Sequence, residues 1–193
     1  MTVLPPARSS AEAHRYLDLH PCGCGETRWQ PQVDVVALAD GELATRYHGD
    51  CPRCGTRREF RFRLPPQPSP PATTSFAYGG PEPSQLIDPG EWLLTSDQYA
   101  ELVPADPARL TDTGQRRHAT AALDRAIAAL DEVLKFVPVG AREVPSTAFT
   151  SDTGRRMWRR EAARFQIDRL RAVRDAYAAL RASVVEDPGT GNG

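Results

Sequence analysis

The sequence predicts an α+β fold in which a small three-stranded sheet is followed by a proline-rich linker and an α-helical bundle. Three observations predict it. Four cysteines form two close pairs near the start of the chain, eight prolines lie between residues 65 and 90, and the remainder has helical periodicity. A chain of 193 residues can hold one ordinary domain or a small module joined to a second core.

We expect four segments along the chain. Residues 1–64 contain a short helix and the sheet module, and residues 65–90 form the linker, because prolines at this density prevent a regular element. Residues 91–185 form the helical domain. Residues 186–193 are expected to be a disordered tail.

The first elements are predicted by local signals. Residues 1–8 suggest a loose leader, and Ser9-Ser-Ala-Glu12 has the spacing of a capping box that opens a short helix. Residues 33–38 are largely apolar and β-branched, Asp40-Gly41 is a turn signal, and residues 43–48 can return as the partner strand.

A third strand is predicted after the second cysteine pair. We expect it over residues 57–64, where apolar and charged residues alternate from Glu59 onward, with Phe60 and Phe62 on one face and Arg61 and Arg63 on the other. We expect the two phenylalanines to form a small core instead of a platform for stacking bases.

The cysteine pairs have the spacing of a metal site. Cys22-Gly-Cys24-Gly and Cys51-Pro-Arg-Cys54-Gly are separated by 26 residues, and two close pairs can bring four thiolates to one tetrahedral zinc ion. Each pair is followed by a glycine that lets the backbone fold back toward the metal. The first pair is one residue short, which leaves His20 or His48 as an alternative ligand.

This order of knuckle, hairpin, knuckle and strand resembles a zinc ribbon over residues 20–64. The resemblance implies a closed, structural zinc site. It also implies four ligands: Cys22, Cys24, Cys51 and Cys54.

Other roles for the cysteines fit the sequence less well. Two disulfides need an oxidising compartment, and Met1 to Arg8 lack the features of a signal peptide. A redox pair would lack the surrounding βαβ pattern. Catalytic zinc would need an open coordination position, which four thiolates do not leave. Because no apolar run approaches a membrane span either, we expect a cytoplasmic protein, and the alanine- and arginine-rich composition suggests a bacterial one.

The C-terminal half shows helical patterns. Apolar residues recur at spacings of four and three from Leu123 to Val137, and a final helix is expected from about Ser151 to Ser183. Asp106-Pro107 places an aspartate at a cap position and a proline at the first helical position of another segment.

Charge is uneven although the net charge is only −1. Residues 155–183 contain nine arginines against three acids, whereas residues 91–136 are acidic. One interpretation is that these helices pair, so that the arginines solvate one face and bridge to the acidic helix. The other is a basic surface for an acidic partner. Its sharpest candidates, which share one helix face, are Arg155, Arg156, Arg159 and Arg160.

The sequence contains none of the common catalytic or nucleotide-binding motifs, and its four histidines are scattered. Asp131 and Glu132 are adjacent on a helix and therefore point about 100° apart, which disfavours a shared site. We expect a protein without catalytic activity.

Two kinds of binding protein are then open. The segments Leu134-Lys-Phe-Val-Pro-Val-Gly140, Val144-Pro145 and Arg164-Phe165…Arg169-Leu170 resemble uncharacterised bacterial proteins, some beside polymorphic toxins. That resemblance covers about half of the chain and implies an immunity or antitoxin-like role with a protein partner; no functional residue follows from it. The alternative is nucleic-acid binding through arginines that crowd the second knuckle, although residues 1–64 have nearly balanced charge.

Overall fold

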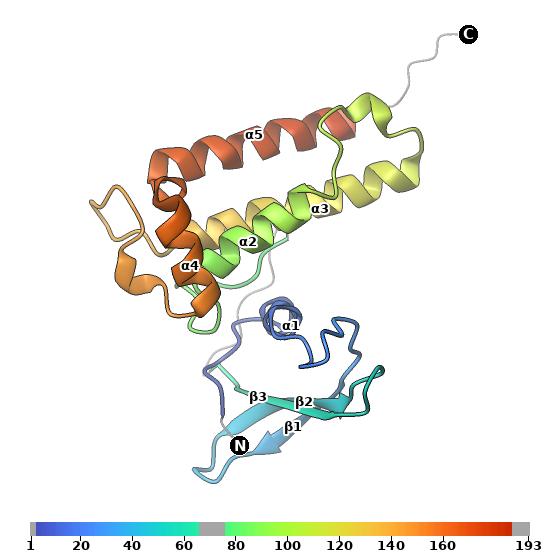
Figure 1. Cartoon of the computed structure of the whole chain (residues 1–193), viewed down its shortest axis with the longest axis vertical. Helices are drawn as coiled ribbons and strands as arrows, with labels where there is room; N and C mark the ends of the chain where they lie inside the picture. Colours follow the sequence, from blue (N-terminus) through green and yellow to red (C-terminus); the bar gives the residue numbers. More distant parts are fainter. Residues whose placement is uncertain (1–2, 66–75, 187–193) are drawn as a thin grey trace. The chain divides into compact units, whose positions relative to one another are not determined.

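The computed structural model describes residues 3–65 and 76–186, which form a mixed α/β protein with a three-stranded antiparallel sheet and five α-helices (Figure 1). The predicted α+β class is confirmed at this level. The chain divides into two compact units. The N-terminal unit comprises residues 1–71 and 78–87, and the C-terminal unit comprises residues 72–77 and 88–193.

The N-terminal unit begins with a segment that joins the sheet. The backbone N–H of Leu4 donates to Arg61 and its carbonyl accepts from Arg63, so the described part of the predicted leader is ordered along an edge strand. Helix α1 (Ser10–Leu19) starts at Ser9, whose hydroxyl accepts the N–H of Glu12. The Glu12 carboxylate reaches one residue further back than a capping box requires, to the N–H of Arg8 at 2.6 Å.

The sheet consists of β1 (Gln32–Ala37), β2 (Leu43–Asp50) and β3 (Arg57–Arg63), in the spatial order β1-β2-β3. The first two strands are joined by the predicted Asp40-Gly41 turn, in which the N–H of Leu38 donates to Glu42 at 2.7 Å. Gly41 has a φ of +86°, a conformation that side chains other than glycine rarely adopt.

Helix α1 covers one face of this sheet (Figure 1). Its Ala13 and Leu17 pack against Tyr47 and Phe62, and Phe60 contacts the same cluster. The opposite face is polar and contains ion pairs such as Arg46 with Asp34, so the predicted alternation along the third strand is confirmed. Both phenylalanines belong to the core.

The predicted linker over residues 65–90 is not confirmed. Its residues 66–75 lie outside the described residues, as do residues 187–193 of the predicted tail. Residues 78–87 belong to the N-terminal unit, where Tyr78 and Ile87 are buried and the Tyr78 carbonyl accepts a hydrogen bond from Ser9. This segment packs because it has apolar side chains between its prolines. A prediction from the number of prolines alone does not take these side chains into account. Proline also fits the start of a helix, and α2 begins at Pro89.

The C-terminal unit contains four α-helices among its described residues. They are α2 (Pro89–Ala100), α3 (Thr113–Leu134), α4 (Asp152–Glu161) and α5 (Ile167–Glu186). Helix α3 packs against α2 and α5, and α2 also contacts α4. The core contains Trp92, Leu123 and Leu130, each fully buried.

The predicted final helix is wrong as one element, because it is interrupted between α4 and α5. A short 3₁₀ segment (Ala162–Phe165) buries Phe165, whose ring meets Phe149 edge-on with centroids 4.7 Å apart. The carbonyl of Phe165 accepts the N–H of Val144, and the N–H of Ile167 donates to Arg142. These contacts with the preceding loop take the chain out of the helical path, and helical periodicity alone does not reveal them.

Candidate metal centre

The first cysteine pair lies in a tight turn after α1. The N–H of Gly25 donates to the carbonyl of Cys22 at 2.7 Å, and the N–H of Cys22 donates to Glu26 at 3.2 Å. Gly25 has a φ of +83°, so glycine is needed there to reverse the chain. The turn places the sulfur atoms of Cys22 and Cys24 on the same side of the loop, near each other and near the second pair.

The second pair lies between β2 and β3 in a turn that is one residue longer. The N–H of Gly55 donates to Cys51 at 2.9 Å, and the N–H of Cys51 donates to Thr56 at 2.9 Å. Gly55 has a φ of +71°, which matches the glycine of the first turn. The two turns thus have the same pattern of backbone hydrogen bonds. The first turn is one residue shorter and still closes in this way.

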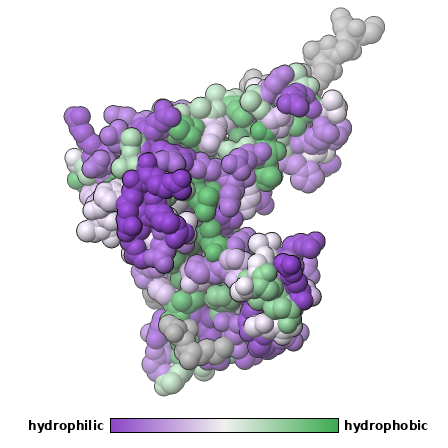
Figure 2. Space-filling model, viewed as in Figure 1, coloured by the Kyte–Doolittle hydropathy of each residue, from purple (hydrophilic) through white to green (hydrophobic). Residues whose placement is uncertain are grey.

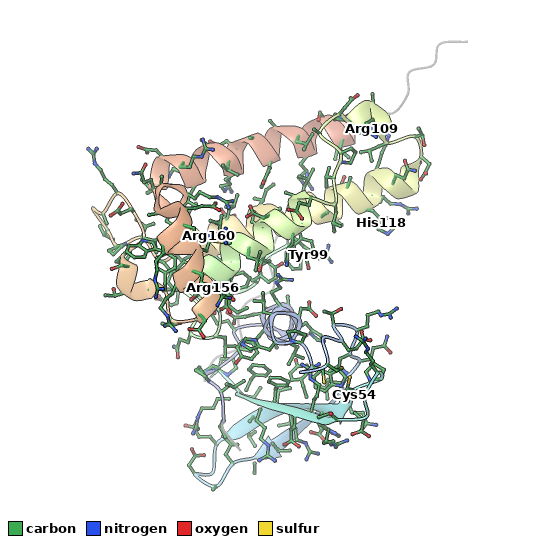
Figure 3. All side chains as sticks on the ribbon, viewed as in Figure 1. Cys54, Tyr99, Arg109, His118, Arg156 and Arg160 are labelled. Carbon is green, nitrogen blue, oxygen red and sulfur yellow. The ribbon has the colours of Figure 1, made fainter. Side chains whose placement is uncertain are left out.

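The four sulfur atoms form one cluster. All lie within 4.8 Å of one another, with 3.6 Å between Cys22 and Cys54 and 3.7 Å between Cys24 and Cys51. All four cysteines are free. Cys22 and Cys51 are buried, whereas Cys54 is exposed and lies at one end of the unit (Figure 3). This cluster is a possible metal site.

Neither alternative histidine belongs to the cluster. His20 stacks on Tyr16, and its Nδ1 lies 2.8 Å from the Tyr16 carbonyl. His48 lies between Asp34 and Arg57, with Nε2 3.2 Å from the carboxylate and Nδ1 2.9 Å from the guanidinium. Among the described residues, the metal-ligand group at this position consists of the four cysteines alone.

The thiols affect one another's ionisation. The backbone N–H of Glu26 lowers the pKa of Cys24, but desolvation and the three neighbouring thiols outweigh it and raise the pKa to about 12. Hydrogen bonds from the side chain and backbone of Thr56, together with two of the other thiols, lower the pKa of Cys54 to about 6. Four thiolates repel one another at these distances, so a bound cation would favour the fully ionised cluster.

Thr56 is a contributor that the sequence prediction missed. Its Oγ1 lies 3.2 Å from the Cys54 sulfur, and its carbonyl closes the second turn. Its position directly after Cys54-Gly55 was the available signal. Arg53 is a second such residue, because its guanidinium donates to the Cys24 carbonyl at 3.2 Å and links the two turns.

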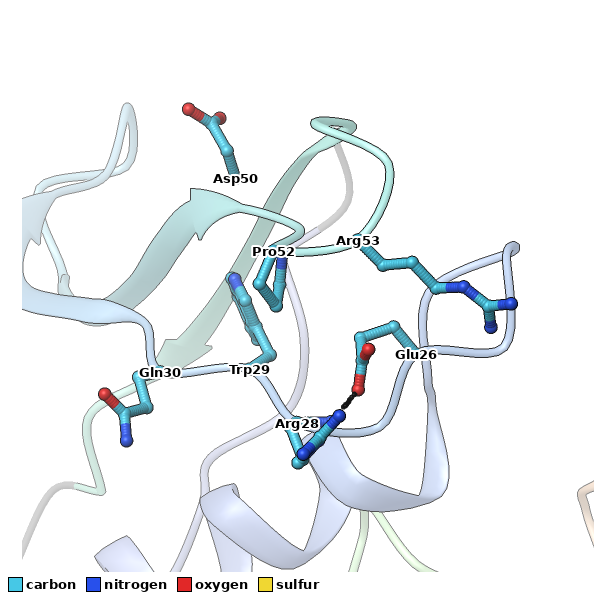
Figure 4. Close-up of a pocket in the computed structure, with 7 residues that line it drawn as sticks. All are labelled: Glu26, Arg28, Trp29, Gln30, Asp50, Pro52 and Arg53. Atoms are coloured by element: carbon cyan, nitrogen blue, oxygen red, sulfur yellow. Dashed lines mark hydrogen bonds and ion pairs between the residues drawn. The ribbon is translucent and has the colours of Figure 1, made fainter.

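A pocket of about 520 Å³ lies beside the two turns (Figure 4). It is lined by Glu26, Arg28, Trp29, Gln30, Asp50, Pro52 and Arg53. Glu26 pairs with Arg28 in this pocket, and Trp29 carries the guanidinium of Arg58 4.2 Å from its ring centroid. Acidic, basic and aromatic groups therefore meet here without a dominant charge.

The other arginines near the second turn have partners within the unit. Arg57 pairs with Asp50, Arg61 with Glu59, and Arg63 with Asp40 and Glu42. Arg58 is buried and donates to the His20 carbonyl. This internal pairing reduces the positive charge that the predicted nucleic-acid surface would need.

The arginine face of α4, defined as Arg155, Arg156, Arg159 and Arg160, lies in the C-terminal unit. Arg155 donates to the Thr150 carbonyl and to Asp152, and its guanidinium is the main reason that the pKa of Asp152 is lowered. Arg156 donates to Thr153. Arg156 and Arg160 are exposed on α4, whose surface is strongly hydrophilic (Figures 2 and 3). Arg159 and Arg160 have no hydrogen-bond or ion-pair partner among the described residues.

The predicted bridging between basic and acidic helices occurs, and three of the nine arginines of residues 155–183 provide it. Arg174 donates to Asp131 and Arg181 donates to Asp124, which connects α5 to α3. Arg164 pairs with Asp97 of α2 at 2.6 Å. The arginine face of α4 does not take part in this bridging.

Comparison of the chain with models of protein families, with characterised proteins and with solved structures finds no match. None of the helices in the described part of the chain has the length and apolar character needed to cross a membrane.

Proposed function

We propose that the N-terminal unit is a zinc ribbon that binds one structural Zn²⁺. Its ligands are Cys22, Cys24, Cys51 and Cys54. The sulfur geometry is the observation that supports this proposal. A tetrahedral ion with Zn–S bonds of about 2.3 Å separates its sulfurs by about 3.8 Å, and two of the cross-pair distances here are 3.6 and 3.7 Å.

The donor set favours zinc in a structural role. Four soft thiolates in tetrahedral positions are typical of zinc or iron–sulfur sites, whereas magnesium and calcium prefer oxygen. Because four protein ligands fill a tetrahedral zinc site, no position is left for a water or a substrate. The proposed role is therefore to hold the two turns together and not to perform catalysis.

Elemental analysis of the chain purified without added metal tests this proposal. We expect close to one zinc per chain, and Cys51→Ser should abolish it. His20→Ala is the matched control, because it removes the histidine next to the first pair and should leave the zinc content unchanged. Iron in place of zinc, or a folded chain without metal, would contradict the proposal.

We further propose that the chain is a non-catalytic binding protein whose arginine face on α4 binds an acidic protein. The exposed, unpaired guanidinium groups of Arg159 and Arg160 support this, because a basic surface without internal partners is available to carboxylates of another molecule. Neutralisation of a protein partner, as implied by the resemblance to immunity proteins, is the role that fits such a surface.

Charge reversal tests the binding surface. The test variant changes Arg156, Arg159 and Arg160 together to Glu. When the chain is used to capture proteins from a nuclease-treated lysate of the native host, this variant should no longer retain the protein partner. Arg155 is kept because its guanidinium also holds Thr150 and Asp152. The matched control reverses three exposed arginines elsewhere in the unit: Arg117, Arg169 and Arg171. Equal losses in the two variants would argue against a specific surface on α4.

Nucleic-acid binding is the alternative function, and it predicts a different signature. Fluorescence anisotropy with mixed DNA and RNA fragments should then show binding that falls log-linearly with salt concentration, because each phosphate contact releases counterions. Micromolar binding with that slope, lost in the α4 variant and kept in the control, would replace the protein partner with a nucleic acid.

A further inference from the structure

The outer edge of β1 differs from the opposite edge of the same sheet. Beyond β3, Leu4 forms backbone hydrogen bonds with Arg61 and Arg63, and Pro5 and Pro6 follow it. Prolines lack the N–H that a further strand would need, so they protect this edge. Beyond β1, no strand is paired among the described residues, and β1 itself contains neither proline nor lysine.

Apart from Gln32, the exposed side chains of β1 are apolar. Val33 and Val35 are 54% and 59% exposed. They lie opposite Tyr47 and Thr45, and therefore on the face that α1 covers further along the sheet. Leu43, opposite Ala37, is 50% exposed on the same face. An open strand edge beside an apolar strip is a template for pairing with another chain.

The hydrogen-bonding phase of β1 is fixed by the hairpin. Leu38 donates to Glu42, and pairing partners alternate along an antiparallel ladder, so Val36 and Asp34 bond to β2. The N–H and C=O groups of Val33, Val35 and Ala37 consequently point outward from the sheet. These are the groups that an added strand would meet.

We infer that β1 pairs antiparallel with β1 of a second copy of this chain, around a two-fold axis that passes between the two copies of Val35. In this register Val35 faces its own counterpart and Val33 faces Ala37 of the second copy. All the outward-pointing groups of the three residues then find partners in H-bonded pairs. Val33 of each copy also becomes a diagonal neighbour of Val35 of the other, which places the exposed valines together.

Neighbouring registers are less favourable. Shifting the axis to Asp34 would place two aspartates directly opposite each other and would bring Pro31, which has no N–H, into a hydrogen-bonding position. Shifting it to Val36 would pair Val33 with Ala39, outside the strand. The register around Val35 avoids both problems and sets each Asp34 opposite Val36.

This pairing gives a closed dimer. A two-fold axis at the β1 edge produces a six-stranded sheet whose two outer edges are the protected β3 edges. Further strands are therefore not added. Because a strand edge is smaller than the roughly 1,200 Å² of stable interfaces, we expect a weak dimer that dissociates on dilution.

Sedimentation analysis of the metal-loaded full chain, from about 5 μM to about 500 μM, tests the inference across the range of weak affinities. We expect a reversible monomer–dimer equilibrium. Val35→Lys places two ammonium groups opposite each other and should weaken the dimer about tenfold or more. Val139→Lys, the same change at a fully exposed position in the C-terminal unit, should leave the equilibrium unchanged.

A second variant separates pairing from misfolding. Val35→Pro removes an N–H that points outward and leaves the bonds between β1 and β2 intact, so the chain should stay folded and keep its metal while losing the dimer. In the unmodified chain, amide exchange at high concentration should slow specifically at Val33, Val35 and Ala37. A monomer at every concentration, or a dimer that Val35→Lys does not weaken, would overturn the inference.

Discussion

The two units of this chain are built around cores of different composition. Among its described residues, the N-terminal unit packs α1 against the sheet and buries Phe62, Tyr78 and Ile87, and four cysteines cluster at the turns at one end of it. The C-terminal unit fully buries large side chains from several helices, among them Trp92, Leu130 and Phe165. Small modules have limited cores, and cross-links or metals commonly add to their stability. In the proposed zinc ribbon, a metal would add to the N-terminal unit stability of the kind that apolar packing gives the C-terminal unit.

The largest expected effect is the loss of metal. Chelation, or Cys51→Ser, should unfold the N-terminal unit, because structural zinc contributes about 10 kcal/mol or more to the folding of small zinc modules. The C-terminal unit should keep its helices. Amide signals resolved by NMR separate the two units in one sample. Simultaneous loss of both sets of signals would show that the units share their stability.

The corresponding change in the C-terminal unit is a charge placed in its helical core. Leu130 is fully buried in α3, and Leu130→Asp should cost about 3 kcal/mol or more because the carboxylate has no partner there. Chemical denaturation followed by far-UV circular dichroism measures the loss. Leu102→Asp, the same change at a side chain that is 70% exposed, is the matched control. Metal content should be unchanged in both variants.

A smaller effect is expected at the start of α2. One oxygen of Asp88 accepts the N–H groups of Gly90 and Glu91, and the other accepts the N–H of Ser151 just before α4. Asp88→Ala should therefore cost more than the roughly 1 kcal/mol of an ordinary N-cap. Asp112→Ala, which removes the cap of α3 alone, provides the comparison in the same denaturation experiment. Equal losses would mean that the link to Ser151 contributes little.

The smallest effect concerns pH. Arg155 lowers the pKa of Asp152, so this carboxylate stabilises the folded state at pH values above its unfolded pKa of about 3.9. The contribution is lost as the pH falls through the lowered folded pKa. Asp152→Asn should slightly lower the thermal midpoint of the C-terminal unit at pH 7, and the difference should shrink below about pH 4. Arg155→Gln should reproduce it, whereas a difference that persists in acid would contradict the ion pair as its cause.

Much of the N-terminal unit could be predicted because its signals are local. Alternation between Phe60, Arg61 and Phe62 determines which face is buried, and Asp40-Gly41 determines where the hairpin turns. The positive φ angles of Gly25 and Gly55 follow from the need to reverse the chain after each cysteine pair. Spacing also predicted that the four cysteines would meet.

Other features depended on contacts between distant residues. Gly90 and Gly154 illustrate this. A Cβ on Gly90 would lie 2.4 Å from the Cα of Gly154, so α2 and α4 can approach this closely only because both residues are glycines. Neither glycine is marked by any local pattern. The interruption between α4 and α5 has the same origin, since Phe165 is drawn into the core by Phe149 and Val144.

The sequence by itself determined the strands, the starts of α1 and α4 and the grouping of the cysteines, because these follow from residue periodicity, capping and turn geometry within short stretches. The tertiary structure decided which arginines pair with α3, how residues 78–87 pack, and that β1 has no paired strand at its outer edge within the described part of the chain. These features depend on which surfaces meet in space. The free energy of such contacts depends on residues that are far apart in the chain. It therefore cannot be predicted from a pattern within a short stretch of sequence.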